Sequence, residues 1–207
     1  MSNEFNVKKA CVVVTGNFDG CHLGHQSLFE QLKQYGKSND LKPLVLSFDK
    51  HTRSVTKGLD IKILSPLFEK KKWFEEEQLS FNYLNFEAEI MALTAKDFVF
   101  EILINRFGAK AWIVGFDHRF GKDLQLLDAS FIEWASLKGL EIIEGKELEL
   151  KTSKVNSTLV RHFLEMGDVE KVNELLGRPY SVLGEVVQGD QIGRTIDFPT
   201  ANLEIET

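Results

Sequence analysis

Short apolar runs rich in β-branched residues recur along the chain, and segments with helical periodicity separate them. The predicted strands cover residues 11–15, 43–48, 79–86, 111–115 and 140–144. The predicted helices between them cover about residues 24–37, 65–77, 95–107 and 128–138. Such alternation predicts an α/β fold, a doubly wound parallel sheet with helices on both faces. Ligands of these sheets bind beyond the carboxyl ends of the strands, so chemistry is expected there.

One of these segments shows the helical pattern clearly. Phe98 and Ile102 stand one turn apart, with apolar neighbours that complete the stripe of a buried helix face. Gly108 follows the last predicted turn and is a suitable helix stop. This segment is therefore expected to cover the sheet.

The pattern changes after about residue 156. Two short helices are predicted, the first ending at Gly167 and the second starting after Asp168, which can cap it. After Pro179 the pattern turns to β. We predict one domain over 1–180 and an incomplete second one over 181–207, because so few residues cannot bury a core alone. The segment YSVLGEVV is expected to be an unpaired edge strand.

Composition limits the classes of partner. The net charge of −6 argues against non-specific binding to nucleic acid or to an anionic membrane, because both need a basic surface. Two cysteines cannot build a disulfide framework or a metal motif, and no segment approaches ~20 apolar residues. A cytoplasmic location is expected. A homo-oligomer is compatible with the sequence.

The loop after the first predicted strand is the richest in chemistry. It reads TGNFDGCHLGHQ and leads into the first predicted helix. A helix N-terminus presents free N–H groups and favours a phosphate. His22 and His25 are three positions apart, hence on one face of the first turn, and a helix N-terminus disfavours their charged form. A neutral imidazole can still donate a hydrogen bond to a phosphate oxygen.

This loop resembles the HxGH nucleotidyltransferases, and GNFDGCHLGHQ is similar to the GxFDGxHxGHQ form of the prokaryotic bifunctional FAD synthetases. The resemblance implies a Rossmann-like sheet and the reaction ATP + FMN → FAD + pyrophosphate. It implies that His22 and His25 contact ATP phosphates. Because no covalent enzyme intermediate is implied, catalysis would rest on alignment and charge stabilisation.

A second segment, VNSTLVR at residues 155–161, resembles the ISSTxIR motif of the same enzymes. Arg161 would stabilise charge on the departing pyrophosphate and is the third catalytic candidate. For Asp19, contact with ligand or metal and organisation of the loop are both open. The resemblance implies ATP-binding roles for Gly16, Asn17, Phe18, Asp19, Gly24, Ser157 and Thr158.

Two loops resemble flavin-side elements. SFDKHT at residues 47–52 corresponds to the family's TFDPHP without its prolines, and GFDHRFGK at 115–122 to GxDFRFGKG. A loop without proline is ordered at greater entropic cost. The implied flavin-binding residues are Phe48, Asp49, His51, Asp117 and Arg119.

The tail resembles the opening of the riboflavin kinase module of these enzymes, a small β-barrel. The matching residues are Gly189, Arg194, Thr200 and Asn202, and Asp197 replaces the glycine of GFPTAN. Because the printed chain stops at Thr207, without the family's catalytic glutamate, no kinase activity is expected.

The expected small molecules are ATP with Mg²⁺, FMN as substrate and FAD as product. The first domain shows no metal motif, so Mg²⁺ is expected to bind through ATP phosphates. Two alternatives stay open. One is another HxGH enzyme, such as a pantetheine-phosphate or nicotinamide-mononucleotide adenylyltransferase; the other is a flavin- or nucleotide-binding relative that does not catalyse.

Overall fold

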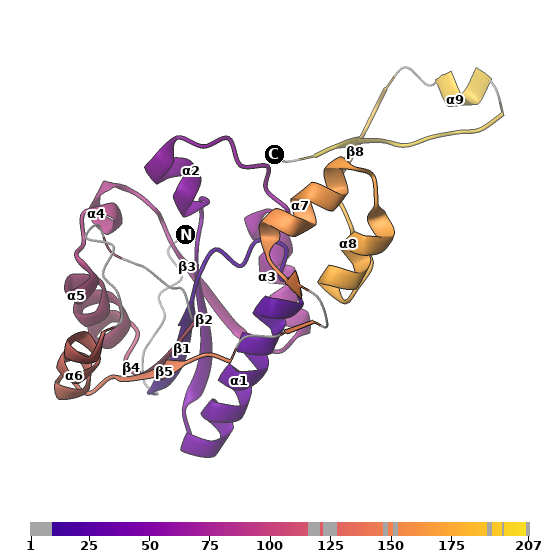
Figure 1. Ribbon diagram of the computed structural model, residues 1–207. Coiled ribbons are helices and arrows are strands. Elements are labelled where there is room, and N and C mark those ends of the chain that lie inside the picture. The colour runs from indigo at the N-terminus through magenta and orange to yellow at the C-terminus, as the bar shows by residue number, and fades with distance from the viewer. Residues whose placement is uncertain are drawn as a thin grey trace.

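The structure is a computed structural model that describes residues 10–115, 121, 128–146, 149–150, 153–189, 192–195 and 197–205. A five-stranded, wholly parallel sheet forms its centre (Figure 1), with the order β3-β2-β1-β4-β5. Its strands are β1 (Cys11–Thr15), β2 (Lys42–Phe48), β3 (Ser80–Leu84), β4 (Ala109–Val114) and β5 (Glu141–Glu144). The predicted α/β fold is confirmed, and each predicted strand is present.

The helices cover both faces of this sheet. Figure 1 shows α1 and α3 on one side and α5 and α6 on the other. The π-helix η1 packs in the same core cluster as α5 and α6. The bounds are α1 (Leu23–Asn39), α2 (Thr52–Lys57), α3 (Leu67–Glu76), α4 (Ala88–Met91), α5 (Ala95–Asp97), the π-helix η1 (Phe98–Arg106) and α6 (Ala129–Leu137). Two further helices, α7 (Ser157–Glu165) and α8 (Val169–Leu176), pack on each other.

Strand β1 shows why the sheet is buried on both sides. Cys11 and Val13 pack into the cluster under η1, whereas Val12 and Val14 point to the opposite cluster under α1. A strand that alternates between two cores must be apolar throughout, as the run CVVV is. Each buried valine stabilises the fold by about 1.5–3 kcal/mol.

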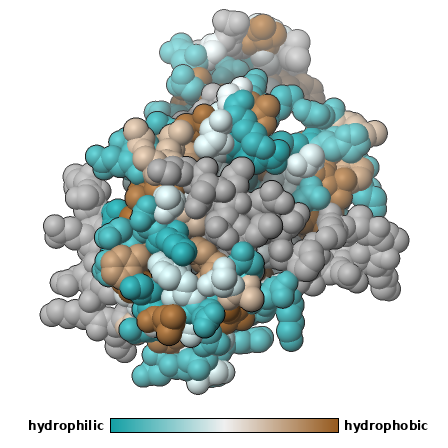
Figure 2. Space-filling view, turned by 60° about the vertical axis from the view of Figure 1, so that its left-hand side comes forward, coloured by the Kyte–Doolittle hydropathy of each residue, from teal (hydrophilic) through white to brown (hydrophobic). Residues whose placement is uncertain are grey.

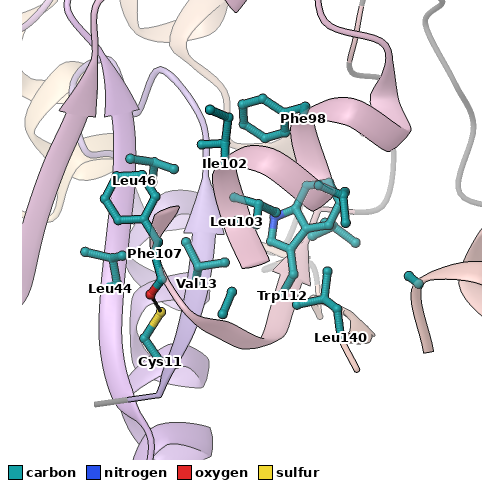
Figure 3. Packing of buried hydrophobic residues seen from close by; sticks show 14 of the residues in the cluster. Cys11, Val13, Leu44, Leu46, Phe98, Ile102, Leu103, Phe107, Trp112 and Leu140 are labelled. Atoms are coloured by element: carbon teal, nitrogen blue, oxygen red, sulfur yellow. Dashed lines mark hydrogen bonds between the residues drawn. The ribbon is translucent and has the colours of Figure 1, made fainter. Parts of the chain in front are cut away.

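The core under η1 is drawn in Figure 3. Phe98 and Ile102 are buried, as the sequence predicts, and Trp112 is completely buried beside them. The thiol of Cys11 donates a hydrogen bond to the carbonyl of Phe107, 3.2 Å away, and joins the first strand to the end of η1. Gly108 follows with a φ of 66°, the left-handed conformation expected of a helix stop.

The C-terminal segment lies apart from the sheet. In Figure 1 its ribbon, with β8 (Glu185–Val187), α9 (Ile192–Thr195) and β9 (Asn202–Glu204), projects away from α7 and α8. β8 pairs antiparallel with β9, so the prediction of an unpaired edge strand was wrong for residues 185–187. The reason is local: the chain turns back, so that β9 pairs with one edge of β8. A short pair, β6 (Glu149–Leu150) and β7 (Ser153–Lys154), precedes α7.

Two bonds tie the start of this segment to the main body. The amide of Tyr180 donates to the side chain of Asn173 over 2.7 Å, and the amide of Leu183 donates to the carboxylate of Glu69 over 3.0 Å. On the face shown in Figure 2, hydrophobic residues form small separate groups among hydrophilic ones. Of the described helices, none is both long and apolar enough to cross a bilayer.

Candidate active site

The turn between β1 and α1 lies where the strand order reverses. β2 and β3 lie on one side of β1, and β4 and β5 on the other. The crevice at such a switch point, at the carboxyl ends of the strands, is where doubly wound sheets bind ligands. The sequence therefore places its richest loop at the position that the fold favours for a site.

The backbone of this turn is unusual. Phe18 has a φ of 47° and Cys21 a φ of 42°, both in the left-handed region that side chains disfavour, and Gly20 between them has a φ of 81°. Non-glycine residues in this region cost roughly 1–3 kcal/mol each and cluster at functional sites. The turn is held in this shape by bonds from other parts of the chain.

His22 and His25 meet as the sequence predicts. His22 is the N-cap of α1, and its Nδ1 accepts a hydrogen bond from the amide of His25 over 3.3 Å. The two rings are stacked, with centroids 3.6 Å apart. The rings of Phe18 and His25 form a T-shaped contact, with centroids 5.3 Å apart. The two histidines therefore contact each other directly at the start of α1.

Both imidazoles are neutral at pH 7. Burial is the main cause that lowers the pKa of His22 to about 4, and Arg178 and Arg161 lower it further. Burial also lowers the pKa of His25, together with His22 and Lys70. The predicted neutral state is supported, but desolvation and nearby cations explain it rather than the helix N-terminus alone. Among the described residues, no group bonds to the buried Nδ1 of His25.

Asp19 connects several segments of the candidate site through hydrogen bonds. One carboxylate oxygen accepts hydrogen bonds from the amides of Leu64 and Ser65, at 2.9 and 3.0 Å. The other pairs with the guanidinium of Arg161. Of the two roles left open for Asp19, these contacts favour the organisation of the loop, because each oxygen already has protein donors.

Helix α7 reaches the same residue. The hydroxyl of Ser157 donates to the backbone carbonyl of Asp19 over 2.9 Å, and Arg161 Nε donates to the carbonyl of Lys62 over 2.6 Å. Asn156 caps the helix by accepting from the amide of Leu159. Thr158 is exposed at the start of α7. The two sequence motifs, far apart along the chain, are therefore in direct contact.

The glycines of the turn have packing reasons. A β-carbon at Gly24 would lie 3.0 Å from the carbonyl oxygen of Val155 and 3.2 Å from Nδ1 of His22. One at Gly16 would lie 3.1 Å from the ring of Phe18. Gly24 thus lets the segment before α7 approach the histidine pair, a reason additional to ligand approach.

The described part of the flavin-side loop borders this turn. Asp49 accepts from the amide of Phe86 over 2.7 Å, and the ring of Phe48 contacts that of Phe86. His51 is the N-cap residue of α2, and its Nδ1 is buried without a bond to any described residue. Burial is the main cause that lowers its pKa. Asp117 and Arg119 lie outside the described residues.

Three side chains at the site were not predicted. Arg178 donates to the carbonyls of Gly20 and Cys21, at 2.9 and 3.2 Å. Gln26 donates to the carbonyls of Cys21 and Leu176, both at 2.8 Å. Lys70 is buried and donates to the carbonyl of Asn17 over 3.0 Å. Arg178 stands in the motif GRPY, but only its contacts across 157 positions reveal what it does.

The predicted kinase-module residues lie together in the projecting tail. A β-carbon at Gly189 would overlap the amide of Asn202, and one at Gly193 would crowd Thr200, while Arg194 is exposed. Asp197, where the family has glycine, has a φ of 57°. Aspartate tolerates this conformation better than most residues, which explains how the replacement is accommodated.

A preformed metal site was not expected in the first domain. Over the described residues, no group of three or more His, Cys, Asp or Glu side chains is placed to hold a metal ion. The residues around the histidine pair instead include Arg161, Arg178 and Lys70. Positively charged groups near the histidine pair favour an anionic ligand such as a phosphate.

Comparison with family models and with known proteins identifies relatives of this chain. The FAD synthetase model matches residues 4–159, and the riboflavin kinase model matches residues 176–207. Bifunctional riboflavin kinase/FMN adenylyltransferases of Listeria monocytogenes and Escherichia coli K12 are each 32% identical, over 94% and 96% of this chain. The chain spans 62% and 64% of the length of these two relatives.

Solved structures include a similar fold. A crystal structure described as a macrolide-efflux protein from Streptococcus pneumoniae is 28% identical, with a TM-score of 0.81. The match covers 99% of this chain and 68% of that one. Together with the match of the family model over most of the sequence, these findings confirm the predicted family: the chain belongs to the FAD synthetase family.

Proposed function

We propose that this chain transfers AMP from ATP to FMN and releases pyrophosphate. The observation that carries the proposal is the pair of neutral, stacked imidazoles at the start of α1, surrounded by Arg161, Arg178 and Lys70. In a protein of net charge −6, this concentration of cations around one turn favours an anionic ligand. A triphosphate matches both this charge and the positive end of a helix dipole.

The hydrogen bonds suggest how each group would act. Because Nδ1 of His22 accepts the amide of His25, the proton of the neutral ring is assigned to Nε2, which would donate to a phosphate oxygen. Arg161 uses Nε and one terminal nitrogen for Lys62 and Asp19, and keeps further N–H donors for the departing pyrophosphate. In this proposal both residues stabilise charge that grows during the reaction.

The chemistry is a direct displacement. A phosphate oxygen of FMN forms a bond to the α-phosphorus of ATP, and the bond from that phosphorus to the bridging oxygen of pyrophosphate breaks. Mg²⁺ would supply charge neutralisation through the ATP phosphates. Phe48, Asp49, His51, Asp117 and Arg119 stay proposed flavin contacts, and Gly16, Asn17, Phe18, Gly24, Ser157 and Thr158 stay proposed parts of the ATP site.

Residues 181–207 are proposed as the first part of a riboflavin kinase module, with the boundary at about residue 180. We also place the protein in the cytoplasm, where ATP is available and the free, buried thiols of Cys11 and Cys21 remain reduced.

The test is an incubation with ATP, Mg²⁺ and FMN, read by chromatography. FAD and pyrophosphate are the expected products. Parallel reactions contain nicotinamide mononucleotide or phosphopantetheine in place of FMN. Another dinucleotide without FAD would refute the proposal, and tight FMN binding without pyrophosphate release would favour a non-catalytic relative.

A further inference from the structure

Lys70 on α3 is buried in an unusual way. Only 7% of its surface is exposed, and its ammonium group donates to the carbonyl of Asn17 at 3.0 Å and to the hydroxyl of Ser47 at 3.4 Å. Within the described residues, no carboxylate lies within 4.0 Å of its Nζ. Burying an ammonium without a contacting carboxylate is unfavourable, so folding alone would prefer an apolar side chain here.

Asn17, the partner of Lys70, connects two loops. Its backbone carbonyl also accepts from the hydroxyl of Ser47, at 3.2 Å on β2. Its side chain makes two bonds to Thr52 at the start of α2: Oδ1 accepts from the amide at 3.1 Å, and Nδ2 donates to the hydroxyl at 3.0 Å. Asn17 therefore joins the turn of the histidine pair to the loop at residues 48–52.

The charge of Lys70 also reaches the histidine pair. It is among the groups that lower the pKa of His25, after burial and His22. Lys70 thus bonds to Asn17, the residue that connects the two loops, and adds positive potential near the histidine pair. Both effects concern the place where anionic substrates are proposed to bind.

We propose that Lys70 is a positioning residue that fixes the Asn17 peptide and so holds the nucleotide turn and the flavin-side loop in one geometry. This inference rests on the proposed function, because it assigns the two loops to the two substrates. Lys70 itself acts through Asn17. Its burial with no contacting carboxylate among the described residues is explained if selection acts on the site rather than on stability.

The first test compares Lys70→Met with Lys71→Met, a change at an exposed lysine on the same helix. Lys70→Met is expected to raise KM for both ATP and FMN about tenfold, the effect of losing a hydrogen bond from a charged donor. Its Tm should stay equal or rise, because a desolvated charge is removed. Lys71→Met should change neither quantity. A lower Tm with unchanged KM values would assign Lys70 a purely structural role and overturn the proposal.

The second test is a double-mutant cycle with Thr52→Val, which removes the acceptor for the Asn17 side chain. Because both changes act through Asn17, their combined effect on KM should be smaller than the product of the single effects. Independent, fully multiplicative effects on KM would contradict the proposal that Lys70 and Thr52 both act through Asn17.

Binding titrations separate this inference from the proposed function. If the unaltered protein forms no FAD, the proposed reaction fails, but calorimetry with MgATP and with FMN still measures what Lys70→Met does. Weaker binding of both ligands would support the role of Lys70 as a positioning residue. Unchanged binding of both would refute it.

Discussion

The carboxylate of Asp19 and the guanidinium of Arg161 are paired across 142 positions of the chain. Their side chains are 4% and 17% exposed, so water screens the pair weakly. One residue belongs to the turn after β1 and the other to α7. This contact joins the two motifs and makes α7 part of the site.

Asp19→Asn should therefore weaken both stability and activity. The amide keeps an acceptor for Leu64 and Ser65 but leaves Arg161 without its anionic partner. We expect a loss of about 1–3 kcal/mol in the free energy of unfolding, measured with urea. Asp60→Asn, at an exposed position, serves as the control. Equal stability of the two variants would show that the ion pair contributes little.

His25→Ala tests the proposed catalytic role of the histidine pair. Loss of one preorganised donor should lower kcat by about 10²-fold or more, with little change in Tm. The exposed His162 provides the control substitution, His162→Ala. A large fall in Tm at near-normal turnover would instead mark His25 as a packing residue.

Stability should fall as the solution becomes acidic. The ordinary histidine pKa is 6.5, whereas that of folded His22 is about 4. Between these values the unfolded chain takes up a proton that the folded protein does not, so the folded state loses about 1.4 kcal/mol per pH unit for this group. Above pH 6.5 this dependence disappears.

Urea unfolding at pH 7, 6 and 5 measures this slope, and His22→Gln should reduce it. An unfolding free energy that is equal at pH 7 and pH 5 would show that His22 titrates normally.

Arg178→Met should disturb the strained turn at residues 18–21, although Arg178 itself lies after α8. The variant loses the donors to Gly20 and Cys21, and we expect kcat/KM for ATP to fall about tenfold. Because Arg178 also lowers the pKa of His22, that pKa should rise, which NMR titration of the ring can measure. Arg194→Met, at an exposed position in the tail, should change neither kcat/KM for ATP nor the pKa of His22. A normal rate and an unshifted His22 would contradict the assigned role.

Removal of divalent metal should stop FAD formation without destabilising the ligand-free protein. In the proposed reaction Mg²⁺ enters with ATP, bound through the phosphates. EDTA should abolish turnover, excess Mg²⁺ should restore it, and Tm without ATP should be unchanged. A fall in that Tm on adding EDTA would reveal a structural metal.

The parts of the fold that could be predicted share a strong local signal. The run CVVV must be a strand buried on both faces, and it pairs with β2 and β4 as such. The polar segment TRSVTK carries no apolar stripe, and α2, which it forms, has no buried residue. Periodicity could not reveal this helix, because packing does not specify it.

The candidate site likewise contains some residues that could be predicted from local sequence and others that could not. The histidine pair could be predicted, because spacing alone places two residues three apart on one helix face. Lys70 is one of three consecutive lysines, a pattern typical of a solvated surface, and only the packing of α3 distinguishes it from the exposed Lys71 and Lys72. The bonds that settle the surroundings of Asp19 join residues 45 and 142 positions away, beyond any local signal.

The hydrogen bonds from Arg178 to the carbonyls of Gly20 and Cys21 matter for any attempt to produce the proposed first domain alone. A chain truncated before Arg178 would lose these two hydrogen bonds to the strained turn, although it would keep the histidine pair and Arg161. The hydrogen bond from Leu183 to Glu69 lies beyond the proposed boundary at about residue 180. A shortened protein that keeps residues through Leu183 should therefore preserve the shape on which the histidine pair depends.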